Sequence, residues 1–441
     1  MADLIALVPE KIGQSFDDAP PGHRYRLYLQ FWQHNFAPTQ KEKLQALKPA
    51  CKLPEHTKKL MQALAKRSVT EESATTHCIE AKSTSPFATG LGWEHPNENG
   101  FAFLDPYGLP YLPGSGVKGV MRLAAEQLAL EPPLPPGEGR GEGNLQWNMA
   151  DVWLMFGFDA NSAIFDHSSD NSMREAWLDR REQLIDEPAL QQFIQASKPG
   201  HAPREFLENL EKPGFRNEIH TQGCLRFWDV IPELADSKME VDILNPHYGD
   251  YYHNGRTPHD AGQPIPVFFL TVPPGSTFCF RVDLLAPQRL GERQKESWKC
   301  LLKAAFDHAF DWLGFGAKTS VGYGAIQIDK EAQAKRERDA AEQAEKRHRE
   351  SMSPIQQKIE DFRKESTERA EQLGNSKEKQ NTGIHQHAQR LTKEARESSE
   401  WTPEEKRELA EIALEWLPQL VERWDKDAAK KLKLADLKGQ S

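Results

Sequence analysis

The use of charged residues changes sharply near residue 330 and divides the chain into two kinds of structure. Residues 331–441 hold 23 Lys and Arg and 24 Asp and Glu, so this segment is densely charged and nearly neutral. The other 33 Lys and Arg and 42 Asp and Glu leave residues 1–330 with a net charge of −9. We therefore expect a separate extension at 331–441 behind an acidic body.

Two segments of the extension carry the residue pattern of a helix start. In each, a hydroxyl residue is followed by proline and, two positions later, by Gln or Glu, as in a capping box. The two patterns are Ser-Pro-Ile-Gln at 353–356 and Thr-Pro-Glu-Glu at 402–405. Residues 331–350 offer only alanines among their charged and polar residues, so we interpret them as a solvated helical connector. We predict an all-helical extension, which either closes as a small bundle or provides a docking surface for a partner.

The body contains short segments typical of strands and apolar repeats typical of helices. Segments of mixed or alternating polarity predict strands at 76–82, 224–230 and 323–328. Residues 266–284 predict two strands joined by a turn at 273–276. Apolar residues at helical spacing predict helices at 117–128 and 293–313. This order is that of a split βαβ unit, so we predict an α+β fold with a ferredoxin-like (RRM-like) core in residues 75–330.

Three further segments complete the predicted organisation. Residues 1–74 form a helical or irregular N-terminal extension. Residues 131–146 begin with a run rich in Pro and Gly, which is typical of an exposed loop. Residues 171–217 are charged and helical, and we interpret them as an insertion into the core.

Composition excludes several classes of protein. No apolar run approaches the roughly 18 residues that span a bilayer, so a membrane protein is disfavoured. The five cysteines are scattered and never paired as Cys-x-x-Cys, which indicates neither a disulfide framework nor a zinc site and favours the reducing cytoplasm. A net charge of −10 argues against an indiscriminate nucleic-acid binder, so any contact with RNA or DNA is expected to be a local patch.

The first motif that could carry chemistry is Pro-Gly-Ser-Gly-Val-Lys-Gly at 113–119, at the start of a predicted helix. Free amides at a helix start, with Ser115 and Lys118 beside them, suit a phosphate. It is not a Walker loop, because Lys118 precedes Gly119 and no hydroxyl follows it. A tight turn that packs the helix on the sheet explains the pattern equally well.

The second motif places four glycines around one lysine at 314–324. It follows a helix and enters a strand, the reverse of the order in a dinucleotide-binding fingerprint. Such a flexible loop, rich in donors, could lie along an RNA backbone, with Phe315 or Tyr323 as candidates to stack on a base. A single glycine here would be explained as the end of the preceding helix. Four glycines are more than a helix cap requires, which favours a ligand-binding loop.

The third motif gathers histidines and aspartates in residues 242–253, with His259 and Asp260 shortly after. This composition suits either a metal site or an acid–base cluster. Its spacing matches no metal signature, and loops rich in Asn, Pro, Gly and Asp usually hold themselves together by local hydrogen bonds. We favour a structural loop here and for His95, and predict no metal, cofactor or catalytic residue.

Taken in order, these motifs resemble the RAMP superfamily of CRISPR proteins. The similarity to the family of sixth subunits of the type III-B (Cmr) effector is closer, and covers about residues 75–330. It rests on Gly-Leu-Gly at 90–92 and on the segments 107–115, 242–252 and 268–272. The glycine loop at 314–324 is general to RAMP proteins, and Asn-Pro-His-Tyr at 245–248 points to this subunit.

The resemblance implies a core that binds guide RNA through its backbone near one end of a helical stack of related subunits. It also implies that RNA cutting and second-messenger synthesis belong to other subunits. The implied partners are CRISPR guide RNA, target RNA and other Cmr-type RAMP subunits, without a membrane. The residues carried over to RNA binding are Ser115, Lys118, Gly119, Gly314, Gly316, Lys318, Gly322 and Gly324, with Arg122 one helical turn beyond Lys118.

Two functions remain open at this point. The first is a non-catalytic, RNA-binding structural subunit of an antiviral ribonucleoprotein. The second is a metal-independent endoribonuclease that processes guide RNA, a role of some RAMP relatives. Such cleavage needs a general base near a 2′-hydroxyl, for which His77, His95 and His247 are the candidates.

Overall fold

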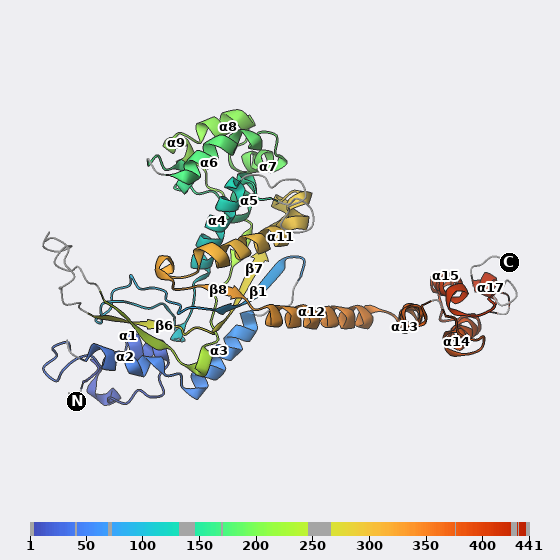
Figure 1. Ribbon diagram of the computed structural model, residues 1–441, viewed down its shortest axis with the longest axis horizontal. Helices are drawn as coiled ribbons and strands as arrows, with labels where there is room; N and C mark the ends of the chain where they lie inside the picture. Colours follow the sequence, from blue (N-terminus) through green and yellow to red (C-terminus); the bar gives the residue numbers. More distant parts are fainter. Residues whose placement is uncertain are drawn as a thin grey trace. The chain divides into compact units, whose positions relative to one another are not determined.

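The computed structural model describes residues 4–39, 42–68, 73–131, 146–168, 171–245, 266–374, 376–424, 430 and 432–437. The chain forms two compact units, Met1–Arg336 and Glu337–Ser441. The first mixes helices with antiparallel sheets, as the predicted α+β class requires (Figure 1). None of the described helices is both long and apolar enough to cross a membrane.

The first unit is organised around a four-stranded antiparallel sheet in the order β4-β7-β1-β8. Its strands are β1 (Thr76–Ser83), β4 (Leu225–Phe227), β7 (Thr277–Leu284) and β8 (Ile326–Ile328). The register places Ile79 opposite Phe280 and Ala81 opposite Phe278, so the apolar alternation of β7 faces that of β1. The strands predicted in these four places are confirmed, although β4 and β8 are shorter than expected.

The predicted segment 266–284 does contain two strands, but they belong to different sheets. Its first strand, β6 (Val267–Thr271), pairs with β5 (Glu240–Leu244) in a separate two-stranded sheet. Its second strand, β7, lies in the central sheet. A short hairpin of β2 (Phe103–Leu104) and β3 (Leu109–Pro110) makes a third sheet.

Two long helices lie on the same side of the central sheet, α4 (Gly114–Leu130) and α11 (Glu292–His308) (Figure 1). A π-helical turn, Ala309–Leu313, extends α11. Phe280 of β7 packs against Phe306, Phe310 and Phe315 at ring-centroid distances of 5.4, 5.8 and 5.0 Å. These aromatic contacts bury the helical face of the sheet and hold the end of α11 over β7.

Helices also precede the sheet and interrupt it. The N-terminal segment contains α1 (Pro21–Arg26), α2 (Lys43–Cys51) and α3 (Glu55–Ser68). After α5 (Met149–Phe156), the segment predicted as an insertion contains α6 (Ser172–Arg180), α7 (Pro188–Ser197), α8 (Pro203–Asn209) and α9 (Pro213–Asn217). The buried rings of Trp153, Trp177 and Phe193 join this cluster to α5. The predicted loop at 131–146 lies almost wholly outside the described residues.

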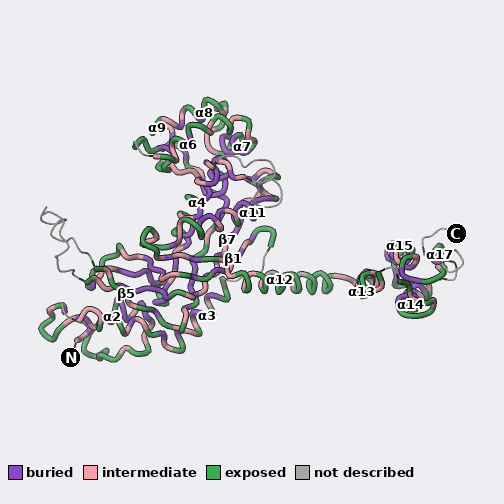
Figure 2. The backbone as a smooth tube through the Cα atoms, in the orientation of Figure 1, coloured by how far each residue is buried: buried purple, intermediate pink, exposed green. Residues whose placement is uncertain are grey.

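The second unit is helical and has its own core. After α12 (Lys330–Ser351) come α13 (Pro354–Leu373), α14 (Gly383–Glu397), α15 (Pro403–Leu420) and α17 (Leu434–Leu437). Apolar residues of α13, α14 and α15 form one buried cluster, which includes Phe362, Leu391 and Leu409, and Figure 2 shows buried residues within α14 and α15. The described side chains of α12 beyond Arg336 are exposed, as expected of a solvated helix.

Both predicted capping boxes are present in the second unit. At α13, Ser353 and Gln356 cap each other's backbone amides, and at α15, Thr402 and Glu405 do the same. The Ser353 hydroxyl also donates to the Glu405 carboxylate at 3.2 Å. The starts of the two helices are therefore connected by side-chain hydrogen bonds.

Removing the Thr402 hydroxyl should loosen α15. Thr402→Ala deletes the acceptor for the Glu405 amide, and removal of such a cap typically costs about 1 kcal/mol. We expect amide hydrogens of α15 to exchange about 5-fold faster in the full-length variant, as measured by hydrogen–deuterium exchange mass spectrometry. Thr402→Ser keeps the hydroxyl and should exchange at the wild-type rate. Equal protection in both variants would show that this cap does not stabilise α15.

Candidate nucleic-acid interface

The first glycine turn, Gly114–Gly119, forms the start of α4 and is held by the segment that follows β4. Leu112 and Val230 exchange backbone hydrogen bonds of 2.8 and 2.9 Å, and the Gly114 amide donates to Asp229 Oδ1 at 2.7 Å. A Cβ on Gly114 would lie 2.3 Å from the carbonyl oxygen of Phe227. Gly114 is therefore required by packing against β4, independently of any ligand.

The next residues of this turn face outward. Ser115, Gly116 and Gly119 are exposed, and a Cβ on Gly119 would meet no atom within 4 Å. Glycine inside a helix costs roughly 1 kcal/mol relative to alanine, yet no neighbouring atom requires it at position 119. Close approach of another molecule's backbone would explain this choice of residue.

Lys118 is the cation of the first turn. Within the described ranges, its ammonium group forms no ion pair or side-chain hydrogen bond. Partial burial, and then the positive charge of Arg122, lower the pKa of Lys118. An anion placed beside this lysine would favour its charged form.

Arg122 is held differently from Lys118. Its Nε lies 2.9 Å from Glu126 Oε1, and its Nη1 lies 3.2 Å from Asp159 Oδ2. Glu126 also accepts a hydrogen bond from the Ser162 hydroxyl at 3.1 Å. Two carboxylates therefore balance the Arg122 charge and tie α4 to the segment that contains Asp159 and Ser162.

The second glycine turn, Gly314–Gly324, joins the π-helical turn to β8 and folds back on the segment after β1. Its four glycines all have positive φ, as does Lys318 (φ 62°). The Ala317 amide donates to Ala88 at 2.7 Å, and the Gly324 amide donates to Pro86 at 2.8 Å. A Cβ on Gly316 would lie 2.3 Å from the Ala88 oxygen, and one on Gly324 1.9 Å from the Phe315 oxygen. These two glycines are therefore required by the turn itself.

The outer part of this turn offers donors. Ser320, Val321 and Gly322 are exposed, as is Gly316. Among the described residues, the amides of Lys318, Thr319 and Ser320 donate to no protein group, and the Lys318 ammonium has no carboxylate partner. The turn therefore combines one uncompensated cation with three open amides, an arrangement that suits a phosphate.

The two aromatic residues of the second turn differ in their exposure and contacts. Phe315 is completely buried, so the expectation that its ring is accessible is wrong. The Tyr323 hydroxyl donates to Asp242 at 2.7 Å, and burial together with this carboxylate raises the pKa of Tyr323 to about 12. Phe315 lies between Gly314 and Gly316, and its buried ring packs against Phe280 and Phe310 beneath the turn.

The elements that carry the two turns are neighbours. Helix α4, which begins with the first turn, packs against α11 and against the π-helical turn that leads into the second. His308 at the end of α11 donates from Nε2 to Gln127 of α4 at 2.7 Å. The helix that begins with the first turn and the π-helical turn that leads into the second therefore pack against each other.

The third sequence motif is only partly visible. Asp242 lies in β5 and binds Tyr323, but residues 246–265, with His247, His253 and His259, lie outside the described residues. The His95 ring stacks on Tyr25 at 3.8 Å and donates from Nε2 to the Tyr25 carbonyl at 3.0 Å, and burial lowers its pKa. His77 packs edge-on against Trp298. No group of three or more metal-ligating side chains occurs in the parts of the chain that the structure describes.

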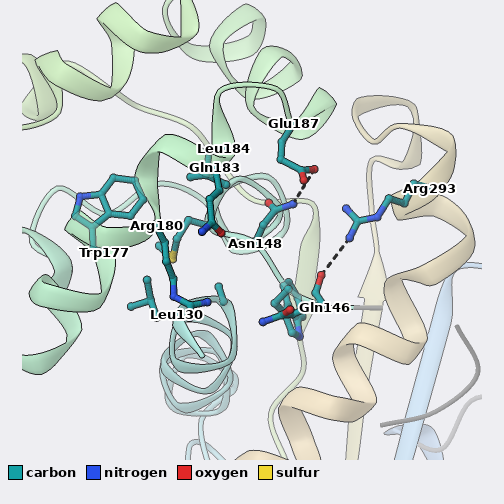
Figure 3. Close-up of a pocket in the computed structure, with 12 residues that line it drawn as sticks. Leu130, Gln146, Asn148, Trp177, Arg180, Gln183, Leu184, Glu187 and Arg293 are labelled. Atoms are coloured by element: carbon teal, nitrogen blue, oxygen red, sulfur yellow. Dashed lines mark hydrogen bonds between the residues drawn. The ribbon is translucent and has the colours of Figure 1, made fainter. Parts of the chain in front are cut away.

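A cavity of about 230 Å³ lies at the other end of α4, between that helix, α5, α6 and α11. Figure 3 shows Arg293 donating to the Gln146 carbonyl (3.1 Å) and Asn148 donating to Glu187 (3.3 Å) across its wall. Arg293 also pairs with the buried Asp151 at 3.2 Å, and Arg180 donates to the Glu131 carbonyl. Because its arginines are already bound, we assign this cavity to packing between the insertion and the body. Sequence reasoning missed it because several distant segments line it.

Comparison with known proteins identifies relatives of this chain. Residues 80–327 match the model of the RAMP superfamily. Over 257 residues the chain is 33% identical to the CRISPR system Cmr subunit Cmr6 of Pyrococcus furiosus, a match that spans 56% of this chain and 66% of that relative, slightly under two thirds.

Two solved structures are also similar. The crystal structure of Cmr6 from Pyrococcus furiosus has 27% identity and a TM-score of 0.26, with 57% of this chain and 97% of that chain covered. The cryo-EM structure of the type III-B Cmr-beta bound to cognate target RNA has 17% identity and a TM-score of 0.37, with 65% and 71% covered. Because both TM-scores are low, the family assignment rests on the sequence matches.

The two ends of the first turn should respond oppositely to alanine. Gly114→Ala forces a Cβ against the Phe227 carbonyl and should lower the free energy of unfolding by about 1–3 kcal/mol. Gly119→Ala fills open space in a helix and should raise it by about 0.5–1 kcal/mol. Urea denaturation of the two full-length variants measures both changes. A lower stability in Gly119→Ala would mean that this glycine is needed by the fold.

Proposed function

The chain belongs to the RAMP superfamily, and on that premise we propose that it is a non-catalytic, RNA-binding structural subunit of a type III-B CRISPR (Cmr) ribonucleoprotein effector. In this role it contacts guide RNA and neighbouring RAMP subunits near one end of the subunit stack, in antiviral defence. The similarity to Cmr6 supports this assignment. The observation that carries it is the pair of exposed turns, each with a lysine that has no carboxylate partner among the described residues.

We further propose that the central sheet with α4 and α11 is a ferredoxin-like core. The chain order β1, α4, β4, β7, α11, β8, combined with the sheet order β4-β7-β1-β8, supports this topology. Because α4 and α11 cover one face of the sheet, the glycine turns at the start of α4 and after α11 remain available to bind a ligand. The charged helical extension follows this core in the sequence and is assigned no role in RNA binding.

The residues of the two turns divide into ligand contacts and supports. Lys118 and Lys318 bind phosphates, with the Ser115 hydroxyl and the open amides of the second turn beside them. Gly119 and Gly322 admit the RNA backbone, whereas Gly314, Gly316 and Gly324 shape the second turn. Arg122 contributes less, because Glu126 and Asp159 already neutralise its charge.

An acidic chain can serve in such an assembly. The net charge of −10 would oppose independent, non-specific RNA binding. A subunit held among partners needs only a few phosphate contacts, because its neighbours supply the rest of the groove. Its acidic surface can then face basic surfaces of those partners. The five free cysteines support placing the assembly in the cytoplasm.

Replacing both lysines should weaken binding and flatten its dependence on salt. Each phosphate of a single strand that a cation no longer neutralises reduces the slope of log K against log salt by roughly 0.7, so Lys118→Ala/Lys318→Ala should lower it by about 1.4. Guide-RNA retention by the complex assembled with co-expressed neighbours, measured across salt concentrations, tests this. The control is Lys358→Ala/Lys364→Ala, which removes the same charge from lysines of α13 that are paired with glutamates. Wild-type retention and slope in the lysine-turn variant would assign both turns to the fold alone.

A second experiment tests the absence of catalysis. The purified chain, incubated with CRISPR repeat RNA in EDTA, should leave the RNA intact. His95, one candidate general base, is stacked on Tyr25 and held by its carbonyl, which supports this expectation. Cleavage that disappears in His77→Ala, His95→Ala or His247→Ala would instead establish a metal-independent endoribonuclease.

A further inference from the structure

We propose that Trp312 is the base-stacking residue for the RNA strand that runs along the second turn. This inference rests on the proposed function and extends it to a residue outside the glycine motif. Trp312 lies in the π-helical turn after α11, and its side chain is 76% exposed. Short π-helical turns within or beside α-helices are frequent at functional sites.

The position of Trp312 relative to the second turn follows from the packing around Gly314. Trp312 precedes Gly314 by two residues, and the Thr319 side chain would lie 3.2 Å from a Cβ on Gly314. The 3-10 turn Thr319–Val321, with Val321 65% exposed, therefore lies next to the backbone that carries Trp312. Trp312 is therefore two residues along the chain from a glycine that touches the segment carrying Lys318 and the open amides.

Core packing does not require an indole at position 312. Phe306, Phe310 and Phe315 fill the space between α11 and β7, whereas Asp311 and Trp312 are exposed. Within the described chain, Trp312 has no hydrogen bond and no aromatic or cationic partner. An indole that is 76% exposed contributes little to the core, and stacking on another molecule would bury it.

Two other exposed tryptophans of this chain have protein groups packed against or bonded to their rings. Trp228 lies under the Arg281 guanidinium at 4.4 Å and donates from its indole nitrogen to Asp283 at 2.7 Å. Trp93 lies near Arg26 at 4.9 Å. Trp312 differs from both because it has no cationic or hydrogen-bonding partner among the described residues.

The surroundings of Trp312 favour a nucleotide base over a protein side chain. The exposed large apolar residues of this part of the chain are Trp312 and Val321, and the same turn carries Lys318, Ser320 and amides that suit phosphate oxygens. A base stacked on the ring would place its own sugar-phosphate beside those donors. Aromatic stacking tolerates every base, which suits a subunit that holds guides of differing sequence.

The affinity for guide RNA of the complex assembled with co-expressed neighbours, measured by filter binding across salt concentrations, tests this proposal. Trp312→Ala and Trp312→Leu should each weaken binding about 10-fold, while Trp312→Phe should stay within about 3-fold of wild type. The slope against salt should not change, because the cations that neutralise phosphates are all retained. Photocrosslinking to RNA that contains 5-iodouridine should disappear in the Ala and Leu variants and persist in Phe. Trp93→Ala, which removes an indole elsewhere, should bind as wild type.

Several outcomes would overturn the assignment. Wild-type affinity in Trp312→Ala, or an equally weakened affinity in Trp93→Ala, contradicts a stacking role for Trp312. The assignment is also contradicted if Trp312→Ala binds RNA normally but no longer co-purifies with the neighbouring subunits. Trp312 would then be a contact to a protein. If the wild-type complex binds no RNA, the proposed function itself fails. If the complex binds RNA and the Trp312 variants are unaffected, only this inference fails.

Discussion

The first unit depends on the antiparallel pairing of β1 with β7. Seven residue pairs, from Thr76 opposite Asp283 to Lys82 opposite Thr277, join strands about two hundred residues apart in sequence. Everything between them, including α4, the helical insertion and the β5–β6 sheet, is enclosed by this one pairing. The entropy cost of closing a loop grows slowly with its length, so a large insertion at this point is tolerated.

The same pairing positions both glycine turns. The segment after β1 supplies the carbonyls of Pro86 and Ala88 that fix the second turn, and the segment after β4, which pairs with β7, fixes the first. Inner glycines and amides of each turn are used by these contacts. Only the outer residues remain for a ligand, so the fold and the proposed RNA contact draw on different atoms of the same motif.

Sequence reasoning succeeded where the signal was local. The capping boxes at Ser353 and Thr402 were predictable because all of their partners lie within three residues. It erred where partners are distant: β6 has the pattern of a strand, but nothing nearby indicates that it pairs with β5 rather than with the central sheet. Burial of Phe315 depends on Phe280 across the sheet, and exposure of Trp312 depends on the π-helical turn that ends α11. The candidate lysines were found from glycine spacing, whereas the balance of Arg122 by Asp159 required the folded chain.

Glu405 gives the helical unit a point of acid sensitivity. Burial opposes its ionisation, but hydrogen bonds from the Thr402 backbone and from the hydroxyls of Thr402 and Ser353 outweigh this and lower the pKa of the carboxyl group. A group whose pKa is lowered by folding stabilises the fold above its unfolded pKa, and that contribution is lost as the pH falls through the folded value. Because the same carboxylate caps α15 and accepts the Ser353 hydroxyl at the start of α13, its protonation would weaken the α15 cap and the link between the two helix starts together.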